Sequence, residues 1–139
     1  MAGNKKTILA NYQHIKEDDY FNFERIGSYR PLEDSQSLQQ LSGHTLSDLD
    51  FDEFFMYADR TCSKVGQQFL YHQLSTIPKT GDRVSTMEQV INFYKQHPEE
   101  KENMVLSLHR LGKPSAYYLK NLSHDQHLSK PKWYPLIWI

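Results

Sequence analysis

The stretch TLSDLDFDEFFMYADRTCSKVGQQFLYHQLSTIP, residues 45–78, decides the fold because it carries two amphipathic helical patterns with a short polar break between them. An acidic start, residues 50–53, suits the positive end of the first helix. The apolar side chains recur at helical spacing in each pattern. They are Phe51, Phe54, Phe55 and Ala58 in the first helix, then Val65, Phe69, Leu70 and Leu74 in the second.

The break between the two helices, ADRTCSKVG, has the polar residues that a sharp helical corner needs. Asp59 can accept hydrogen bonds from backbone N–H groups of the next turn, and Thr61 or Ser63 can cap the second helix. Gly66 lies in the first turn of that helix, where glycine costs about 1 kcal/mol against alanine. A glycine there predicts that another element approaches the backbone closely. We therefore expect a rigid corner without catalytic chemistry.

The rest of the sequence predicts helices only, since no run alternates with period two and no Asn-Gly or Asp-Gly hairpin turn occurs. Residues 1–16 are polar and receive no predicted element. Helices are expected near residues 18–26, 33–41, 84–94, 98–111 and 114–122, with stops at Gly27, Gly43 and Gly112 and with Pro98 as a first residue. The predicted fold class is all-α, a bundle of about six helices.

Two of these helices have clear apolar faces and are expected to help form the core. The face of the first comprises Val84, Met87, Val90, Ile91 and Tyr94. The buried face of the second would comprise Val105, Leu108 and Leu111.

Composition excludes several classes of protein. The 139 residues suffice for one ordinary domain, and 16 Lys and Arg against 17 Asp and Glu give a formal charge of −1. An autonomous DNA-binding domain usually has a basic excess, which is missing here. The single cysteine, Cys62, rules out an intrachain disulfide and a Cys-rich zinc site. Without an apolar run behind the N-terminal lysines or an apolar stretch of roughly 18 residues, we expect no signal peptide or spanning helix, and a cytoplasmic protein.

Residues 45–122 resemble the opening of the helical core (lever) domain of MutS-type proteins. In that family a helix ends in a Leu-Asp-x-Thr-like corner, and a Thr/Ser-x-x-Gly start, a Leu-rich helix and a Leu-x-x-Pro-like exit follow. The corresponding residues here are 58–61 (ADRT), 63–66 (SKVG), Leu70 with Leu74, and 74–78 (LSTIP). Residues 83–113 are similar to the family's next helical pair. The leading LSDLDFDEFF is closer to short, divergent MutS-related proteins than to the mismatch-repair enzyme.

The sequence also departs from the family. Ala58 replaces a larger aliphatic residue, and Met87 or Glu88 stands where an arginine is often found. The mismatch-reading domain does not fit into residues 1–44, and residues 21–24 (FNFE) are better interpreted as an aromatic helix face than as its Phe-x-Glu wedge. No Gly-x-x-x-x-Gly-Lys-Ser/Thr phosphate loop occurs, because Gly112-Lys113 is followed by Pro114.

The resemblance implies a non-catalytic fragment at the front of a longer MutS-like ATPase. Its expected parts are an N-terminal helical extension (1–44), the core-like segment (45–122), and a linker with an apolar tail (123–139). The fragment would hold no cofactor, while the parent protein would bind ATP and Mg²⁺ at a phosphate loop downstream. Its implied partners are the rest of the same chain, including the ATPase domain, DNA contacted only by the full-length protein, and a second copy in a homodimer.

Two further patterns invite other interpretations. His124, Asp125 and His127 could contribute to a zinc site, but spacing indicates no further ligand elsewhere to complete it, so an exposed polar linker is favoured. Cys62 lies near a helix N-terminus, which can activate a thiol. Without an indicated histidine partner it is better interpreted as a half-buried structural cysteine.

The tail KPKWYPLIWI leaves two explanations open. Lysines followed by interfacial aromatics and an apolar run are typical of a cytoplasmic approach to a membrane, so the full-length protein would be membrane-associated. The tail would otherwise pack on the helical core. The alternative function is therefore a helical protein-interaction module, near a membrane surface and without a DNA role.

Overall fold

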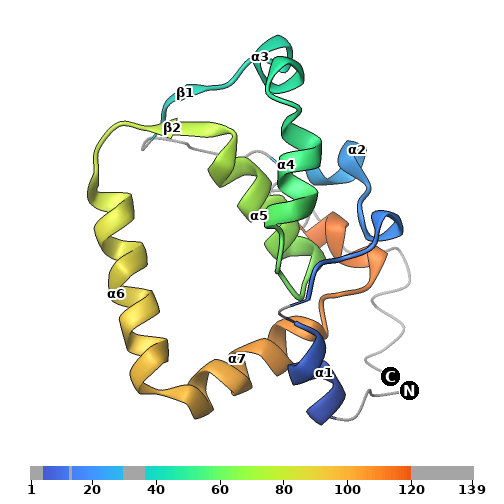
Figure 1. Cartoon of the computed structure of the whole chain (residues 1–139), viewed down its shortest axis with the longest axis vertical. Helices are drawn as coiled ribbons and strands as arrows, with labels where there is room; N and C mark the ends of the chain where they lie inside the picture. The colour runs from blue at the N-terminus through green and yellow to red at the C-terminus, as the bar shows by residue number, and fades with distance from the viewer. Residues whose placement is uncertain (1–4, 13, 30–36, 120–139) are drawn as a thin grey trace, which may run out of the picture.

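A computed structural model describes residues 5–12, 14–29 and 37–119, and within these ranges the chain is mostly helical (Figure 1). The first elements are α1 (Lys5–Asn11), η1 (Asp18–Tyr20, a 3-10 helix), α2 (Phe23–Ile26), β1 (Ser37–Gln40) and α3 (Gly43–Asp48). The later elements are α4 (Phe51–Ala58), α5 (Lys64–Leu74), β2 (Thr76–Pro78), α6 (Asp82–Gln96), α7 (Pro98–His109) and the 3-10 helix η2 (Pro114–Tyr118).

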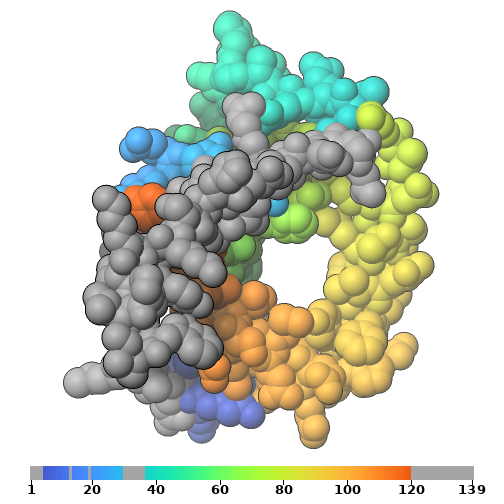
Figure 2. Space-filling model, turned by 180° about the vertical axis from the view of Figure 1, so that it is seen from behind, coloured from blue at the N-terminus to red at the C-terminus, as the bar shows by residue number. Residues whose placement is uncertain are grey.

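The helices do not form a closed bundle. Helices α5, α6 and α7 follow one another around an opening, with α4 beside α5 and with α1 against α7 (Figure 1). The opening between α6 and the rest of the molecule is also visible in the space-filling view from behind (Figure 2). Helix α6 therefore forms an arm that joins β2 to α7 at a distance from the core.

The core lies where α2, α4, α5 and η2 meet. Ile26, Phe55 and Tyr117 are buried at its centre. Around them pack the partly buried Phe21, Phe23, Leu70, Tyr71 and Leu74. The rings meet mostly edge to face, as between Phe55 and Tyr71 with centroids 5.2 Å apart, an arrangement that adds attraction beyond the buried area. Residues before position 45, expected as an extension, thus supply Ile26 and two phenylalanines to the same core as α4 and α5.

A small antiparallel sheet corrects the all-α prediction. Gln39 pairs with Ile77 and Gln40 with Thr76, and the N–H group of Leu41 donates to the carbonyl oxygen of Ser75 at 2.9 Å. The predicted helix over residues 33–41 is therefore wrong from residue 37 onward, and residues 30–36 lie outside the described ranges. The spacing of Leu38 and Leu41, three residues apart, favours a helix here, but Leu38 is 68% exposed. Residues 37–40 form a strand because they pair with β2, which lies 36 or more residues later in the sequence. This pairing outweighs the weak local preference for a helix.

Several predicted boundaries also shift. Gly43 begins α3 behind the capping hydroxyl of Ser42, so it does not end a helix. The helix expected from Asp18 is split into η1 and α2, and the side chain of Asn22 caps α2 by accepting from the N–H group of Arg25. Gly27 ends α2 as predicted. Residues 5–11, which received no predicted element, form α1.

The later helices are present, but their faces are not buried as expected. Helix α7 starts with Pro98 and buries Val105, while Leu108 is 37% exposed and the helix ends at His109, three residues before Gly112. Helix α6 buries no residue in the part of the chain that the structure describes. The helix predicted over 114–122 is the short η2, with Tyr118 exposed and Tyr117 buried. Residues 120–122 of that predicted helix lie outside the described residues.

Candidate functional site

The connection between α4 and α5 is built around one buried carboxylate, that of Asp59, which has no exposed surface. Its Oδ1 accepts from the backbone N–H group of Thr61 at 2.7 Å, which tightens the turn. Its Oδ2 accepts from the amide nitrogen of Gln67 at 2.8 Å and from the ammonium group of Lys16 at 2.5 Å. A buried charge is tolerated only when it is paired and hydrogen-bonded, and these donors meet that condition.

Ser63 begins α5 as its N-cap. Its hydroxyl oxygen accepts from the N–H group of Gly66 at 2.9 Å, and its carbonyl oxygen accepts from that of Gln67. The N–H group of Lys64 donates to the carbonyl oxygen of Leu111 at 2.9 Å. Three N–H groups at the start of α5, those of Lys64, Gly66 and Gln67, thus donate to protein acceptors, which leaves this helix start poorly suited to bind an anion.

Gly66 is required by the corner itself. A Cβ atom on Gly66 would lie 2.8 Å from the hydroxyl oxygen of Ser63 and 3.2 Å from Cβ of Thr61. The close approach that we expected from a separate element therefore comes from Ser63, which caps α5, and from Thr61 in the turn before it.

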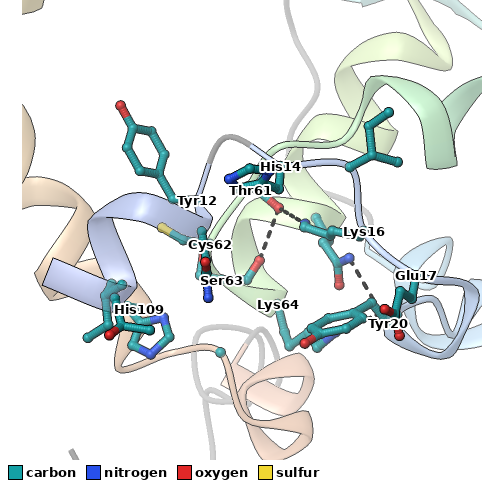
Figure 3. A pocket seen from close by; sticks show the side chains of 16 residues that line it. Tyr12, His14, Lys16, Glu17, Tyr20, Thr61, Cys62, Ser63, Lys64 and His109 are labelled. Atoms are coloured by element: carbon teal, nitrogen blue, oxygen red, sulfur yellow. Dashed lines mark hydrogen bonds between the residues drawn. The ribbon is translucent and has the colours of Figure 1, made fainter. Parts of the chain in front are cut away.

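Lys16 joins the segment between α1 and η1 to this corner through its ion pair with Asp59. Its ammonium group also donates to the hydroxyl oxygen of Thr61 at 3.2 Å, as Figure 3 shows. Burial lowers the pKa of Lys16, although the hydrogen bond and the charge of Asp59 oppose that shift. The ion pair thus joins residues 43 positions apart in the sequence.

Gln67 carries the same network across the core to η2. The hydroxyl group of Tyr117 donates to its side-chain oxygen at 2.8 Å. Burial, and next the charge of Asp59, raise the pKa of Tyr117 to about 12. The neighbouring Gln68 donates to the carbonyl oxygens of Arg25 at 2.9 Å and Tyr117 at 3.2 Å. Two buried glutamines therefore join α5 to both the N-terminal segment and η2.

A cavity of about 520 Å³ lies beside the corner, between α1, the segment that follows it and the start of α5 (Figure 3). Its cationic side chains are already engaged. Lys16 pairs with Asp59, and Lys64 donates to the carbonyl oxygen of Tyr20 at 2.7 Å and lies over two tyrosine rings. The cavity therefore presents neither lysine as an uncommitted charge to a ligand.

Cys62 lines this cavity but lacks the properties of a nucleophile. Burial raises the pKa of its thiol, whereas a reactive cysteine needs a lowered pKa. Its Sγ lies 3.7 Å from the carbonyl oxygen of Val105, to which the thiol can donate. This geometry agrees with a half-buried structural cysteine.

Residues 5–12, 14–29 and 37–119 present neither a metal cluster nor a membrane-spanning helix. Within these ranges no group of three or more His, Cys, Asp and Glu side chains is placed to hold a metal ion. No helix there combines the length and apolarity needed to cross a membrane. The HDQH pattern and the apolar tail lie outside the described residues.

The structure brings the four residues singled out from the sequence into one corner, with separate roles. Asp59 is the central acceptor, Ser63 the cap, and Gly66 the residue that leaves room for the cap. Thr61 does not cap α5; its N–H group and hydroxyl bind Asp59 and Lys16 instead.

Sequence reasoning missed Lys16, Gln67 and Tyr117. Buried glutamines interrupt the apolar stripe and leave Phe69 51% exposed, so periodicity alone could not find them. The only available signal was the adjacent pair Gln67-Gln68 within the amphipathic pattern of α5.

Comparison with known proteins adds no relative, since no family model, curated protein or solved structure matches this chain. The functional interpretation therefore depends on the corner's own geometry and on the resemblance carried by residues 45–122.

Proposed function

We propose that this chain is a non-catalytic part of the helical lever, or core, of a MutS-related ATPase. The parent protein would bind ATP and Mg²⁺ downstream and couple their binding to mismatched or branched DNA. This chain would transmit movement between parts of that protein. DNA and ATP would be contacted only by the full-length protein.

The observation that carries this proposal is the burial of Asp59 at the meeting point of several segments. Through Lys16, Thr61 and Gln67 its carboxylate joins the segment before η1, the α4–α5 corner and, by way of Tyr117, η2. Buried polar networks whose members are all satisfied are rigid and favour one arrangement. A joint of this kind suits an element that must move as one body.

The same network argues against catalysis at the corner. Each polar group is used in a structural hydrogen bond, and the nearby thiol has a raised pKa. The formal charge of −1 also supports contact with DNA through other parts of the parent protein.

The coding sequence beyond Ile139 provides the sharpest test. We expect a Gly-x-x-x-x-Gly-Lys-Ser/Thr loop some hundreds of residues downstream. Its absence from the complete gene would contradict the proposal. The purified chain should neither hydrolyse ATP nor show salt-dependent binding to branched or mismatched DNA. Turnover of ATP by this chain alone would contradict a non-catalytic role.

A second candidate is a helical protein-interaction module near a membrane surface, without a DNA role. The exposed side chains of α6 favour it, because an apolar helix face without a covering element is typical of a binding surface. A gene without a downstream phosphate loop, together with co-sedimentation of the chain with anionic lipid vesicles, would select this candidate over the first.

A further inference from the structure

Helix α6 exposes an apolar face that the described part of the chain leaves uncovered. Val84 is 60% exposed, Met87 44% and Ile91 53%, and α6 packs mainly against α7. A solvated helix of 15 residues is marginally stable in water by itself. The apolar face and the weak anchoring both indicate that α6 normally packs against another helix.

The spacing of that face specifies the kind of neighbour. Val84, Met87, Ile91 and Tyr94 are separated by three, four and three residues, which is the a, d, a, d spacing of a coiled coil over two heptads. Both a positions, Val84 and Ile91, hold β-branched residues. In parallel coiled coils, β-branched residues at a with Leu at d favour two strands, and here the d positions hold Met87 and Tyr94, which are likewise not β-branched.

The flanking charges favour the same arrangement. Arg83 occupies the g position before Val84, and Glu88 occupies the e position after Met87. In a parallel pair a g residue lies opposite the e residue five positions later in the other copy, so Arg83 would meet Glu88 twice by symmetry. An antiparallel pair would place the two Glu88 carboxylates together. Arg83 donates one N–H to the carbonyl oxygen of Gln73 at 2.5 Å, and a guanidinium has further donors for a second contact.

We propose that α6 is a dimerisation helix that pairs in parallel with α6 of a second copy of this chain. The inference comes from the face of α6 alone and does not depend on the proposed MutS-like role. A helix of 15 residues is about 22 Å long, so the contact is small and the dimer should be weak. In the dimer, Val84, Met87, Ile91 and Tyr94 form the seam, and Arg83–Glu88 pairs flank it.

The oligomeric state of the purified chain tests this proposal. Sedimentation velocity over loading concentrations from about 1 μM to about 500 μM should show a shift from monomer toward dimer. Ile91→Asp places a charge in the seam and should keep the chain monomeric throughout. The control Asn92→Asp adds the same charge one position away, outside the seam, and should dimerise like the parent. Far-UV circular dichroism should be unchanged in both variants, because both sites are exposed.

Glu88→Lys separates the two orientations. In the parallel pair this substitution sets a new ammonium group against the Arg83 guanidinium and should weaken the dimer at least several-fold. An antiparallel pair keeps like charges together and changes little. A parent chain that stays monomeric, a dimer that survives Ile91→Asp, or a dimer indifferent to Glu88→Lys would each overturn the proposal. None of these outcomes bears on the downstream phosphate loop, so failure here is distinct from failure of the proposed function.

Discussion

Helix α5, which begins at the α4–α5 corner, and helix α6, the arm, have similar apolar periodicity in sequence but differ in structure. Each is an amphipathic helix, yet α5 buries Gln67, Gln68 and His72 whereas α6 buries nothing among the described residues. The difference lies in partners that are distant in the sequence. Lys16, Arg25 and Tyr117 supply hydrogen bonds to the corner from both sides, and no such set reaches α6 within the part of the chain that the structure describes. Apolar periodicity therefore predicts a helix but does not predict what buries it.

Removal of one large side chain from each region should give the largest contrast. Phe55 is fully buried, so Phe55→Ala should lower the free energy of unfolding by about 3–5 kcal/mol. Ile91→Ala on α6 should cost under about 1 kcal/mol in the monomer, because its side chain is 53% exposed. Urea unfolding at low protein concentration measures both. Equal losses would show that α6 belongs to the core.

The corner carboxylate should have the next largest effect. Asp59→Ala leaves Lys16, Gln67 and the N–H group of Thr61 without their acceptor, at a cost of about 3 kcal/mol. The exposed Glu88→Ala in α6 should change stability by less than about 0.5 kcal/mol in the monomer. A double-mutant cycle with Lys16→Met and Asp59→Asn should show coupling of the two side chains. Additive losses would argue against the ion pair.

These contrasts show what the sequence could and could not predict about the fold. Helices α4 and α5 and the break at Asp59 follow from apolar spacing, acidic N-terminal residues and capping side chains, which are all local signals. The β1–β2 pair was missed because its strands are short and lie far apart in the sequence, and Leu38 with Leu41 imitated a helix. The exposed face of α6 was missed because its spacing is the same whether or not a partner is present.

The candidate site was only half predictable for the same reason. Asp59, Ser63 and Gly66 act on neighbours within eight residues, so cap and turn chemistry identified them. Lys16 lies 43 residues before its partner Asp59 in the sequence, and Tyr117 lies 50 residues after its partner Gln67. No spacing rule links residues over such distances in a single sequence.

Alkaline pH should destabilise the α4–α5 corner, not the α6 arm. The pKa of Tyr117 is about 12 in the folded chain against 10.0 for an ordinary tyrosine, so between these values the folded state keeps a proton that the unfolded chain loses. The stabilisation contributed by the protonated Tyr117 hydroxyl is complete below pH 10. It decreases by about 2 kcal/mol as the pH rises toward 12. Tyr71, whose pKa is also about 12, adds a smaller loss, because solvent screens its partly exposed side chain.

Urea unfolding at several alkaline pH values measures this dependence. Tyr117→Phe should reduce the slope of stability against pH relative to the parent chain. A slope unaffected by Tyr117→Phe would show that the Tyr117 hydroxyl does not titrate within the network.

Two glycines give the smallest and most closely matched comparison. Gly66→Ala would bring Cβ within 2.8 Å of the Ser63 hydroxyl and disturb the cap, at a cost of about 1 kcal/mol. Gly81, before α6, has no atom within 4 Å of its Cβ position and a helical φ of −75°, so Gly81→Ala should be neutral or stabilise by up to about 1 kcal/mol. Thermal unfolding of the two variants should therefore shift in opposite directions or differ clearly in size.

Native-state hydrogen exchange tests the difference between corner and arm most directly. At concentrations where the chain is monomeric, backbone amides in α5 should open only with global unfolding, while those in α6 should exchange through local opening. We predict protection in the middle of α5 at least roughly 100-fold greater than in the middle of α6. Equal protection in the two helices of the monomer would contradict the account, because α6 would then be held as firmly as the corner.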